Sequence, residues 1–166
     1  SSGWQTPEAW LPGMSDRDKG VRDAILMSLR GRVKSLKTEE LGELVGSPYA
    51  DVRIFAGQTL LTADQEAFDQ YGFDLLIDED TVVRSTTLRA MGVRRVTGWV
   101  RIMSRSLLDE DYVIQRVAMD ALLTDRHEGV RALKEYVALN PQARISTLAR
   151  AELDSCLLYT SPSPRD

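Results

Sequence analysis

Apolar side chains recur along this chain with a period of 31 residues. One column, taken as the reference position of each repeat, reads Val21, Val52, Val83, Ile114 and Ile145. The columns four and eight residues later are also mostly apolar and read Ile25, Ala56, Thr87, Ala118 and Ala149, then Leu29, Leu60, Met91, Leu122 and Leu153. Spacings of four and eight residues place side chains on one face of an α-helix, whereas a strand would alternate at every second residue. The pattern therefore predicts five helices in one register, without an insertion or deletion between them.

Polar residues that favour helix N-termini recur five residues before each reference position. They are Asp16, Ser47, Asp78, Asp109 and Asn140. Each side chain can accept a hydrogen bond from the free backbone N–H groups of a first helical turn. These residues are predicted to be N-caps, which places the helices at about 17–30, 48–61, 79–92, 110–123 and 141–154.

The segments between these helices also carry apolar residues at helical spacing, such as Phe68 and Leu75. The first copy is irregular, because a helix that begins at Thr6-Pro7-Glu8 is expected to end at Pro12-Gly13. The prediction is an all-α chain of five helix–turn–helix repeats with no strand. Their approximate bounds are 4–35, 36–66, 67–97, 98–128 and 129–155.

The repeated motif resembles the HEAT repeat, in the short variety first named from bilin (phycobilisome) lyases. The resemblance is carried by Asp78-x-x-x-x-Val83-Arg84, by Asp109-x-x-x-x-Ile114 and by Ser47-Pro48-x-x-x-Val52-Arg53-x-x-Ala56-x-x-x-Leu60. It implies a right-handed α-solenoid over residues 4–155, with the second helix of each repeat on the concave side. Such arrays serve mainly as scaffolds, so the expected role is binding of a protein or peptide partner. Two other roles stay open: an accessory subunit for a lyase acting on a tetrapyrrole–protein substrate, and a nucleic-acid-binding array.

The resemblance also implies a structural role for the residue after each reference position. In similar repeats, an arginine there contacts acidic or carbonyl groups of neighbouring turns. A structural ladder is therefore expected from the column Arg22, Arg53 and Arg84 together with the acidic residues Asp16, Asp78 and Asp109. Gln115 and Ser146 depart from this pattern in the last two repeats.

Composition narrows the classes of function. The 166 residues include 21 Lys and Arg against 25 Asp and Glu, a net charge of −4, which disfavours nucleic acid as a partner. One cysteine cannot form an internal disulfide and one histidine cannot build a His-based metal site. No apolar run has membrane-spanning length and no signal-peptide pattern opens the chain. The expectation is a soluble chain without cofactor or membrane partner; nothing indicates a homo-oligomer, and the compartment stays open.

Three weaker chemical features have simpler interpretations. His127-Glu128 resembles the dyads of HEAT-type deoxyhypusine hydroxylases, but iron would need several such dyads, and an exposed first-turn pair is the simpler interpretation. The tryptophans Trp4, Trp10 and Trp99 are interpreted as packing residues. The basic run Arg30, Arg32, Lys34 and Lys37 is interpreted as a solvated connection, balanced by nearby glutamates. No catalytic residues are therefore predicted.

Residues 156–166 match, at all eleven positions, a translated transposase-end sequencing adapter. They are expected to be a non-native tail, so that Cys156 carries no native chemistry. The remaining chain is then expected to be a fragment of a longer protein.

The helical wheel predicts which residues face away from the core. Positions −2, +2 and +6 from each reference position point outward and contain few Lys or Glu residues. The hypothetical partner-binding residues in these columns are Ile54, Gln58, Arg89, Tyr112 and Arg116. Tyr112 and Arg116 are the expected anchors, because aromatic residues and Arg are enriched at interface centres. The alternative is a plain inner surface without a partner.

Overall fold

The computed structural model describes residues 7–29, 38–63 and 65–158. Within these ranges the chain forms ten α-helices and no strand, which confirms the all-α prediction. The basic run at 30–37 and Trp4 lie outside the described residues. The chain divides into two compact units, Ser1–Arg94 (unit 1) and Arg95–Asp166 (unit 2). In neither unit does the described part include a helix long and apolar enough to cross a lipid bilayer.

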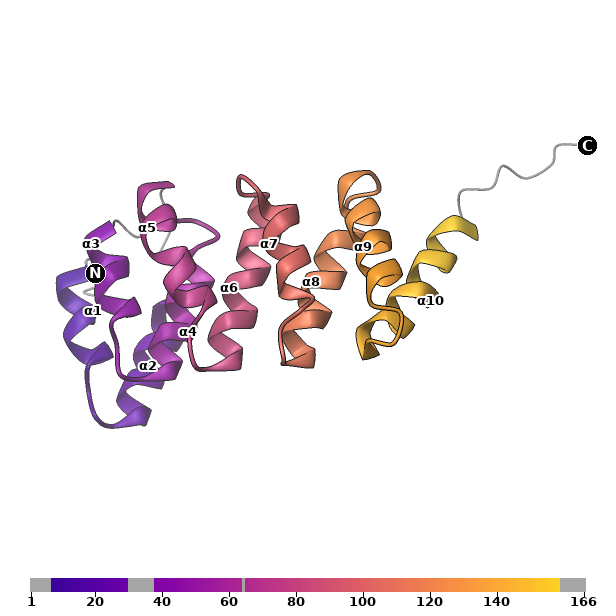
Figure 1. The fold of residues 1–166 in the computed structure, drawn as a ribbon. Helices are drawn as coiled ribbons and strands as arrows, with labels where there is room; N and C mark the ends of the chain where they lie inside the picture. Colours follow the sequence, from indigo (N-terminus) through magenta and orange to yellow (C-terminus); the bar gives the residue numbers. More distant parts are fainter. Residues whose placement is uncertain (1–6, 30–37, 64, 159–166) are drawn as a thin grey trace, which may run out of the picture. The chain divides into compact units, whose positions relative to one another are not determined.

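The described residues of unit 1 form six helices in two layers (Figure 1). They are α1 (Pro7–Met14), α2 (Lys19–Leu29), α3 (Thr38–Val45), α4 (Ala50–Thr59), α5 (Gln65–Leu76) and α6 (Thr81–Arg94). The odd-numbered helices pack side by side, as α1 on α3 and α3 on α5. The even-numbered helices do the same, as α2 on α4 and α4 on α6, and contacts of α1 with α2, α3 with α4 and α5 with α6 join the two layers. Every helix therefore buries one face against the opposite layer.

Unit 2 repeats this arrangement with four helices in the part of it that the structure describes. They are α7 (Trp99–Ser106), α8 (Tyr112–Leu123), α9 (Glu128–Leu139) and α10 (Arg144–Leu158). Helix α7 packs on α9 and α8 packs on α10, while consecutive helices contact one another across the layers. Helix α10 extends into the tail predicted to be non-native and ends at Leu158.

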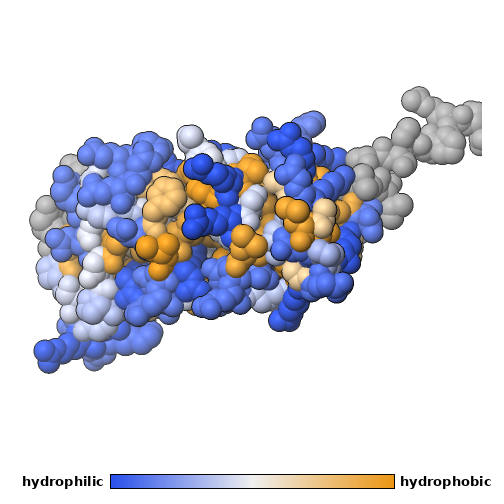
Figure 2. Space-filling view, viewed as in Figure 1, coloured by the Kyte–Doolittle hydropathy of each residue, from blue (hydrophilic) through white to orange (hydrophobic). Residues whose placement is uncertain are grey.

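The cores of both units are built from the apolar columns of the 31-residue pattern. All described residues of the columns at +4 and +8 are buried, and so is the reference column from Val52 onward. Val21 differs, because 40% of it is exposed in the first turn of α2. Around these cores the face shown in Figure 2 is mostly hydrophilic, with separate apolar side chains among the polar ones. The helical periodicity thus identified the buried face of each even-numbered helix.

The predicted N-caps are wrong, and the first four lie two residues before the residue that precedes the helix. Helices α2, α6 and α8 begin after Asp18, Asp80 and Asp111, whose carboxylates accept hydrogen bonds from first-turn N–H groups at 2.7 to 2.8 Å. Tyr49 precedes α4 and provides no side-chain cap. Asn140 is instead the C-cap of α9, and its Nδ2 donates to the Tyr136 carbonyl.

The four other residues predicted as caps form a turn just before each helix. The side chains of Asp16, Ser47, Asp78 and Asp109 each accept a hydrogen bond from the backbone N–H two residues later, at 2.8, 3.2, 2.9 and 2.8 Å. Asp and Ser favour both Asx-type turns and N-caps for the same reason, their short side-chain acceptor. Spacing alone did not distinguish the two roles.

The first helix is longer than predicted. Helix α1 continues through Pro12 and Gly13 and ends at Met14. The φ angle of proline is compatible with a helix, so Pro12 costs a hydrogen bond and a local distortion without ending the segment. Trp10 in this helix is buried, consistent with a packing role.

Candidate functional site

The polar column that follows each reference position makes the same contact in every repeat. Its members are Arg22, Arg53, Arg84, Gln115 and Ser146. Each side chain donates a hydrogen bond to the backbone carbonyl six residues earlier, at 2.9, 3.1, 2.9, 2.7 and 2.7 Å in chain order. The acceptor carbonyls belong to Asp16, Ser47, Asp78, Asp109 and Asn140. Glutamine and serine therefore preserve the contact where arginine is replaced, and the column fixes the turn before each even-numbered helix.

In unit 1 this column also connects neighbouring helix pairs through carboxylates. Arg22 Nε donates to Asp51 Oδ2 at 2.9 Å, and its guanidinium lies 3.7 Å from the centroid of the Tyr49 ring. Arg53 donates from Nε and Nη2 to both oxygens of Asp78, at 2.7 and 3.1 Å. The acidic partner of Arg22 is thus Asp51, which the sequence did not identify. Asp16 contributes its carbonyl and its Asx-type turn instead.

Hydrogen bonding decides the charge state of the Arg53–Asp78 pair. The hydrogen bond to Asp78 raises the pKa of the Arg53 guanidinium, although burial acts in the opposite direction. Burial alone would raise the pKa of the Asp78 carboxyl, but the hydrogen bonds from Arg53 and from the Asp80 N–H outweigh it. The pKa of Asp78 therefore lies below its ordinary value of 3.8. Both groups are charged at neutral pH.

This pKa shift predicts a dependence of stability on acidity. A carboxyl with a depressed pKa in the folded state stabilises the fold above its unfolded pKa, and this contribution disappears as the pH falls through the folded pKa. We expect the free energy of unfolding to decrease as the pH drops below the ordinary Asp78 value of 3.8. Asp78→Asn should make this decrease shallower in urea titrations repeated at successive pH values. Identical pH slopes for the two proteins would show that Asp78 does not contribute.

The residues predicted to bind a partner fall into two groups, one in each unit. In unit 1, Ile54 is half-buried and Gln58 exposed on α4, while Arg89 is exposed on the neighbouring α6. Arg89 has no ion-pair partner in the described part of the chain. In unit 2, Tyr112 is half-buried and Arg116 exposed, both on α8.

The unit 2 group includes a residue that the sequence did not indicate. The Arg144 guanidinium lies 3.9 Å from the centroid of the Tyr112 ring, which is cation–π geometry. Arg116 Nε donates to Asp120 Oδ1 at 3.2 Å, and this hydrogen bond raises the pKa of the arginine. Arg144 lies on α10, which packs on α8. Two arginines and a tyrosine ring therefore gather on the even-numbered helices of unit 2.

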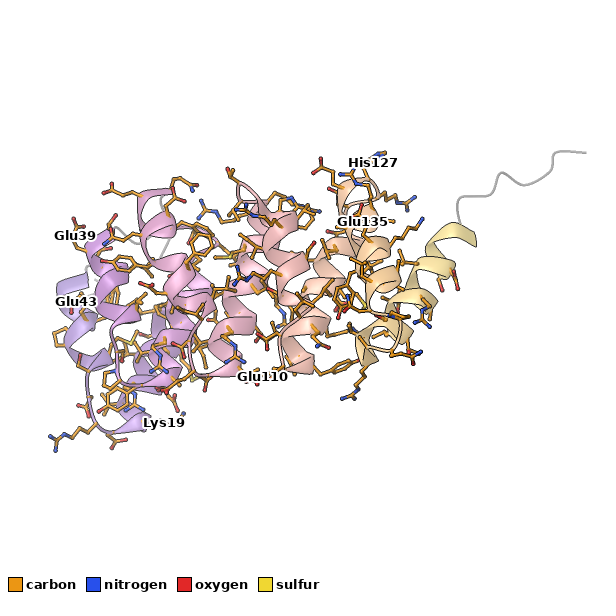
Figure 3. All side chains as sticks on the ribbon, viewed as in Figure 1. Lys19, Glu39, Glu43, Glu110, His127 and Glu135 are labelled. Carbon is orange, nitrogen blue, oxygen red and sulfur yellow. The ribbon has the colours of Figure 1, made fainter. Side chains whose placement is uncertain are left out.

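The remaining candidates have structural surroundings. His127 is exposed at the start of α9 (Figure 3), and Glu128 follows it as the first helical residue. Among the residues whose placement is described, no three His, Cys, Asp or Glu side chains are grouped for a metal ion. Trp99 is buried, with the Arg95 guanidinium 3.9 Å from its ring centroid. The burial of Trp99 fits a packing role, and the exposure of His127 and Glu128 fits an exposed pair at the start of a helix.

The chain matches no model of a known protein family, and no curated protein sequence is significantly similar to it. Because these comparisons give no function, two features of the structure remain as evidence. They are the polar column that repeats through both units and the exposed residues of the even-numbered helices.

Proposed function

We propose that this protein is a HEAT-type repeat protein, a right-handed α-solenoid of five repeats over residues 4–155, that acts as a scaffold for a protein or peptide partner. The repeated hydrogen bond from the column after the reference position supports the repeat assignment. It recurs at 31-residue intervals from Arg22 to Ser146, with the same acceptor position each time. Repeats that share both their buried face and their turn contact can stack on their neighbours in one register.

The observation that carries the binding role is the cluster of Tyr112, Arg116 and Arg144 in unit 2. Arg116 and Arg144 are exposed, and the Tyr112 ring lies beneath the Arg144 guanidinium. Tyr and Arg are the residues that most often supply binding energy at interface centres. Because Arg144 holds the ring in place, a partner would meet a pre-organised surface and lose less entropy on binding. In unit 1, the half-buried Ile54 and the exposed Gln58 and Arg89 are the second group of proposed partner-binding residues, on α4 and α6.

Binding at this cluster predicts a loss of affinity in a double variant. Peptides selected from a random phage-displayed library against the whole chain would serve as probes. Tyr112→Ala combined with Arg116→Ala should weaken the selected peptides by about tenfold or more, since truncation of interface anchors costs over about 1.4 kcal/mol. Fluorescence anisotropy would measure the affinities, and far-UV circular dichroism would verify that the helices are intact.

A matched control lies in the same unit. Arg101 and Arg105 are exposed on α7, in the odd-numbered layer. Arg101→Ala with Arg105→Ala should leave the affinity within about twofold, because these residues lie outside the proposed interface. If every selected peptide binds the Tyr112 and Arg116 variant as tightly as the wild type, the proposed site is wrong.

A further inference from the structure

Arg144 lies over an aromatic ring but has no acceptor for its donor groups in the described part of the chain. In unit 1, Arg22 lies 3.7 Å from the centroid of the Tyr49 ring, and its Nε also donates to the Asp51 carboxylate at 2.9 Å. Arg144 lies 3.9 Å from the centroid of the Tyr112 ring, yet its guanidinium forms no hydrogen bond or ion pair with a described residue. Arg144 is also exposed, so its N–H groups can reach an acceptor on another molecule.

Two other arginines that lie over rings behave like Arg22. Arg95 lies over Trp99 and donates to the Thr124 hydroxyl at 2.7 Å. Arg94 lies over Phe68 and donates to a backbone carbonyl at 2.6 Å. A ring covers one face of the planar guanidinium and leaves the N–H groups at its edge for hydrogen bonds. In these residues the chain itself supplies the acceptor.

A carboxylate is the acceptor that best matches the edge of Arg144. The guanidinium presents its five N–H donors in a fixed planar fork, and the two oxygens of a carboxylate can accept from two of them at once. The chain uses this geometry in unit 1, where Arg53 donates to both oxygens of Asp78 at 2.7 and 3.1 Å. An acidic side chain from outside the molecule would complete the same interaction at Arg144.

Arg116 adds a second positive charge beside the same ring. Its Nε donates to Asp120 Oδ1 at 3.2 Å, and the two side chains are 46% and 57% exposed. This hydrogen bond, and to a smaller extent the Tyr112 hydroxyl, raises the pKa of the Arg116 guanidinium. An exposed ion pair of this kind is weak, because water screens it. A carboxylate of a partner can therefore compete with Asp120 for Arg116.

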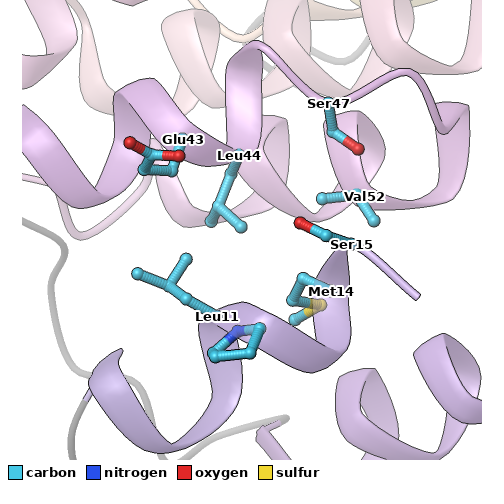
Figure 4. Close-up of a pocket in the computed structure, with 8 residues that line it drawn as sticks. Leu11, Met14, Ser15, Glu43, Leu44, Ser47 and Val52 are labelled. Carbon is cyan, nitrogen blue, oxygen red and sulfur yellow. The ribbon is translucent and has the colours of Figure 1, made fainter.

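The pocket of unit 1 offers no comparable site for an acidic group. It has a volume of about 280 Å³ and opens between α1, α3 and the start of α4 (Figure 4). Its lining contains one carboxylate and no Lys or Arg, and consists of Leu11, Pro12, Met14, Ser15, Glu43, Leu44, Ser47 and Val52. A carboxylate would meet a group of its own charge there. We therefore expect an acidic segment at Arg116 and Arg144 and not in this pocket.

We propose that Tyr112, Arg116 and Arg144 form a carboxylate-binding site and that its partner is an acidic segment of a protein. One Asp or Glu side chain of the segment accepts two hydrogen bonds from the edge of Arg144, while the Tyr112 ring supports the face of this guanidinium. A neighbouring carboxylate of the segment pairs with Arg116. The proposal rests on the binding role proposed above for this cluster and adds the chemistry of the partner.

A rhodamine-labelled peptide of alternating Glu and Ser is a suitable probe, titrated into the whole chain and followed by anisotropy. The chain has a net charge of −4, so its overall charge does not attract this peptide and binding would report a local site. The same peptide with Gln in place of each Glu should bind at least about tenfold more weakly, because it loses the charged acceptors. Equal binding of the two peptides, or no binding of the Glu peptide, would overturn the proposal.

Replacement of Arg144 tests the site directly. Arg144→Gln should weaken binding of the Glu peptide by about tenfold, since it removes the bidentate donor. Arg101→Gln is the matched control, because Arg101 is exposed on α7 of the same unit and loses the same charge. The control should change the affinity by less than about twofold, because a surface charge outside the site is screened. Far-UV circular dichroism would verify the helices, and equal weakening by both variants would overturn the proposal.

Replacement of Asp120 tests Arg116 in the opposite direction. Asp120→Asn removes the competing carboxylate, so it should tighten binding of the Glu peptide by about threefold. Glu135→Gln removes the same charge from an exposed residue of α9 and should change the affinity by less than about twofold. A purely structural Arg116–Asp120 pair predicts no gain in affinity. Unchanged or weaker binding to the Asp120→Asn variant would overturn the role of Arg116.

The carboxylate site and the general binding role can fail separately. The peptides selected from the random library would be titrated into the Arg144→Gln variant as well. If they bind it like the wild type but lose affinity for the Tyr112 and Arg116 double variant, the binding role stands and the carboxylate site is wrong. If they bind both variants like the wild type, the binding role itself is wrong.

Discussion

Replacing Arg53 by methionine is expected to lower the free energy of unfolding of unit 1 by about 3 kcal/mol, because one partner of a nearly buried ion pair is removed. Arg53 and Asp78 expose only 11% and 10% of their side chains. The guanidinium also donates to the Ser47 carbonyl at 3.1 Å. Methionine retains an unbranched apolar stem, so the decrease in the free energy of unfolding reports the contribution of the charged guanidinium. Asp78 would keep its hydrogen bond from the Asp80 N–H but would lose its cation.

Urea titration followed by far-UV circular dichroism would measure this effect. Arg89→Met is the matched control, since Arg89 is exposed on α6 of the same unit, and it should change stability by less than about 0.5 kcal/mol. Arg53→Met combined with Asp78→Asn should cost less than the sum of the two single substitutions, because the residues contact each other. Additive costs would show that the pair is not coupled.

The 31-residue period was sufficient to predict the helices of the even-numbered layer. Each of those helices carries its own apolar columns, so the signal is local and does not depend on the neighbouring repeat. Helix starts were less accurate, because residues such as Asp109 satisfy the requirements of both an N-cap and an Asx-type turn. Asp111, two residues later, is the cap that the structure contains. The composition of a turn predicts where a helix begins only to within a few residues.

The contacts between helix pairs could not be predicted in the same way. Arg22 pairs with Asp51 and Tyr112 stacks with Arg144, and in both cases the partners lie on different helix pairs. A single sequence contains many acidic and basic residues at suitable distances along the chain. To identify the residue that forms the contact, the relative placement of two helices must be known, and the local sequence pattern does not contain it. The candidate site of unit 2 was therefore predicted only in part.

Gly129 illustrates a tertiary effect that opposes local propensity. Glycine is unfavourable within a helix, yet Gly129 occupies the second position of α9 and is buried. A Cβ atom at this position would collide with the Leu122 carbonyl oxygen and lie 3.0 Å from Asp125 Cβ. Glycine thus permits the close approach of α9 to the end of α8. Sequence alone presents it as a weak point of the helix.

Leu122→Ala in unit 2 is expected to cost about 2 to 5 kcal/mol of unfolding free energy, through lost burial and the cavity left behind. Leu122 has an exposed fraction of 0% and lies on the buried face of α8, in the +8 column. Leu139→Ala is the matched control, because Leu139 is 81% exposed at the end of α9 and loses the same atoms. The control should cost less than about 1 kcal/mol, since almost no apolar contact is removed. Both variants would be measured by urea titration, and equal costs would show that the +8 column does not form the core of unit 2.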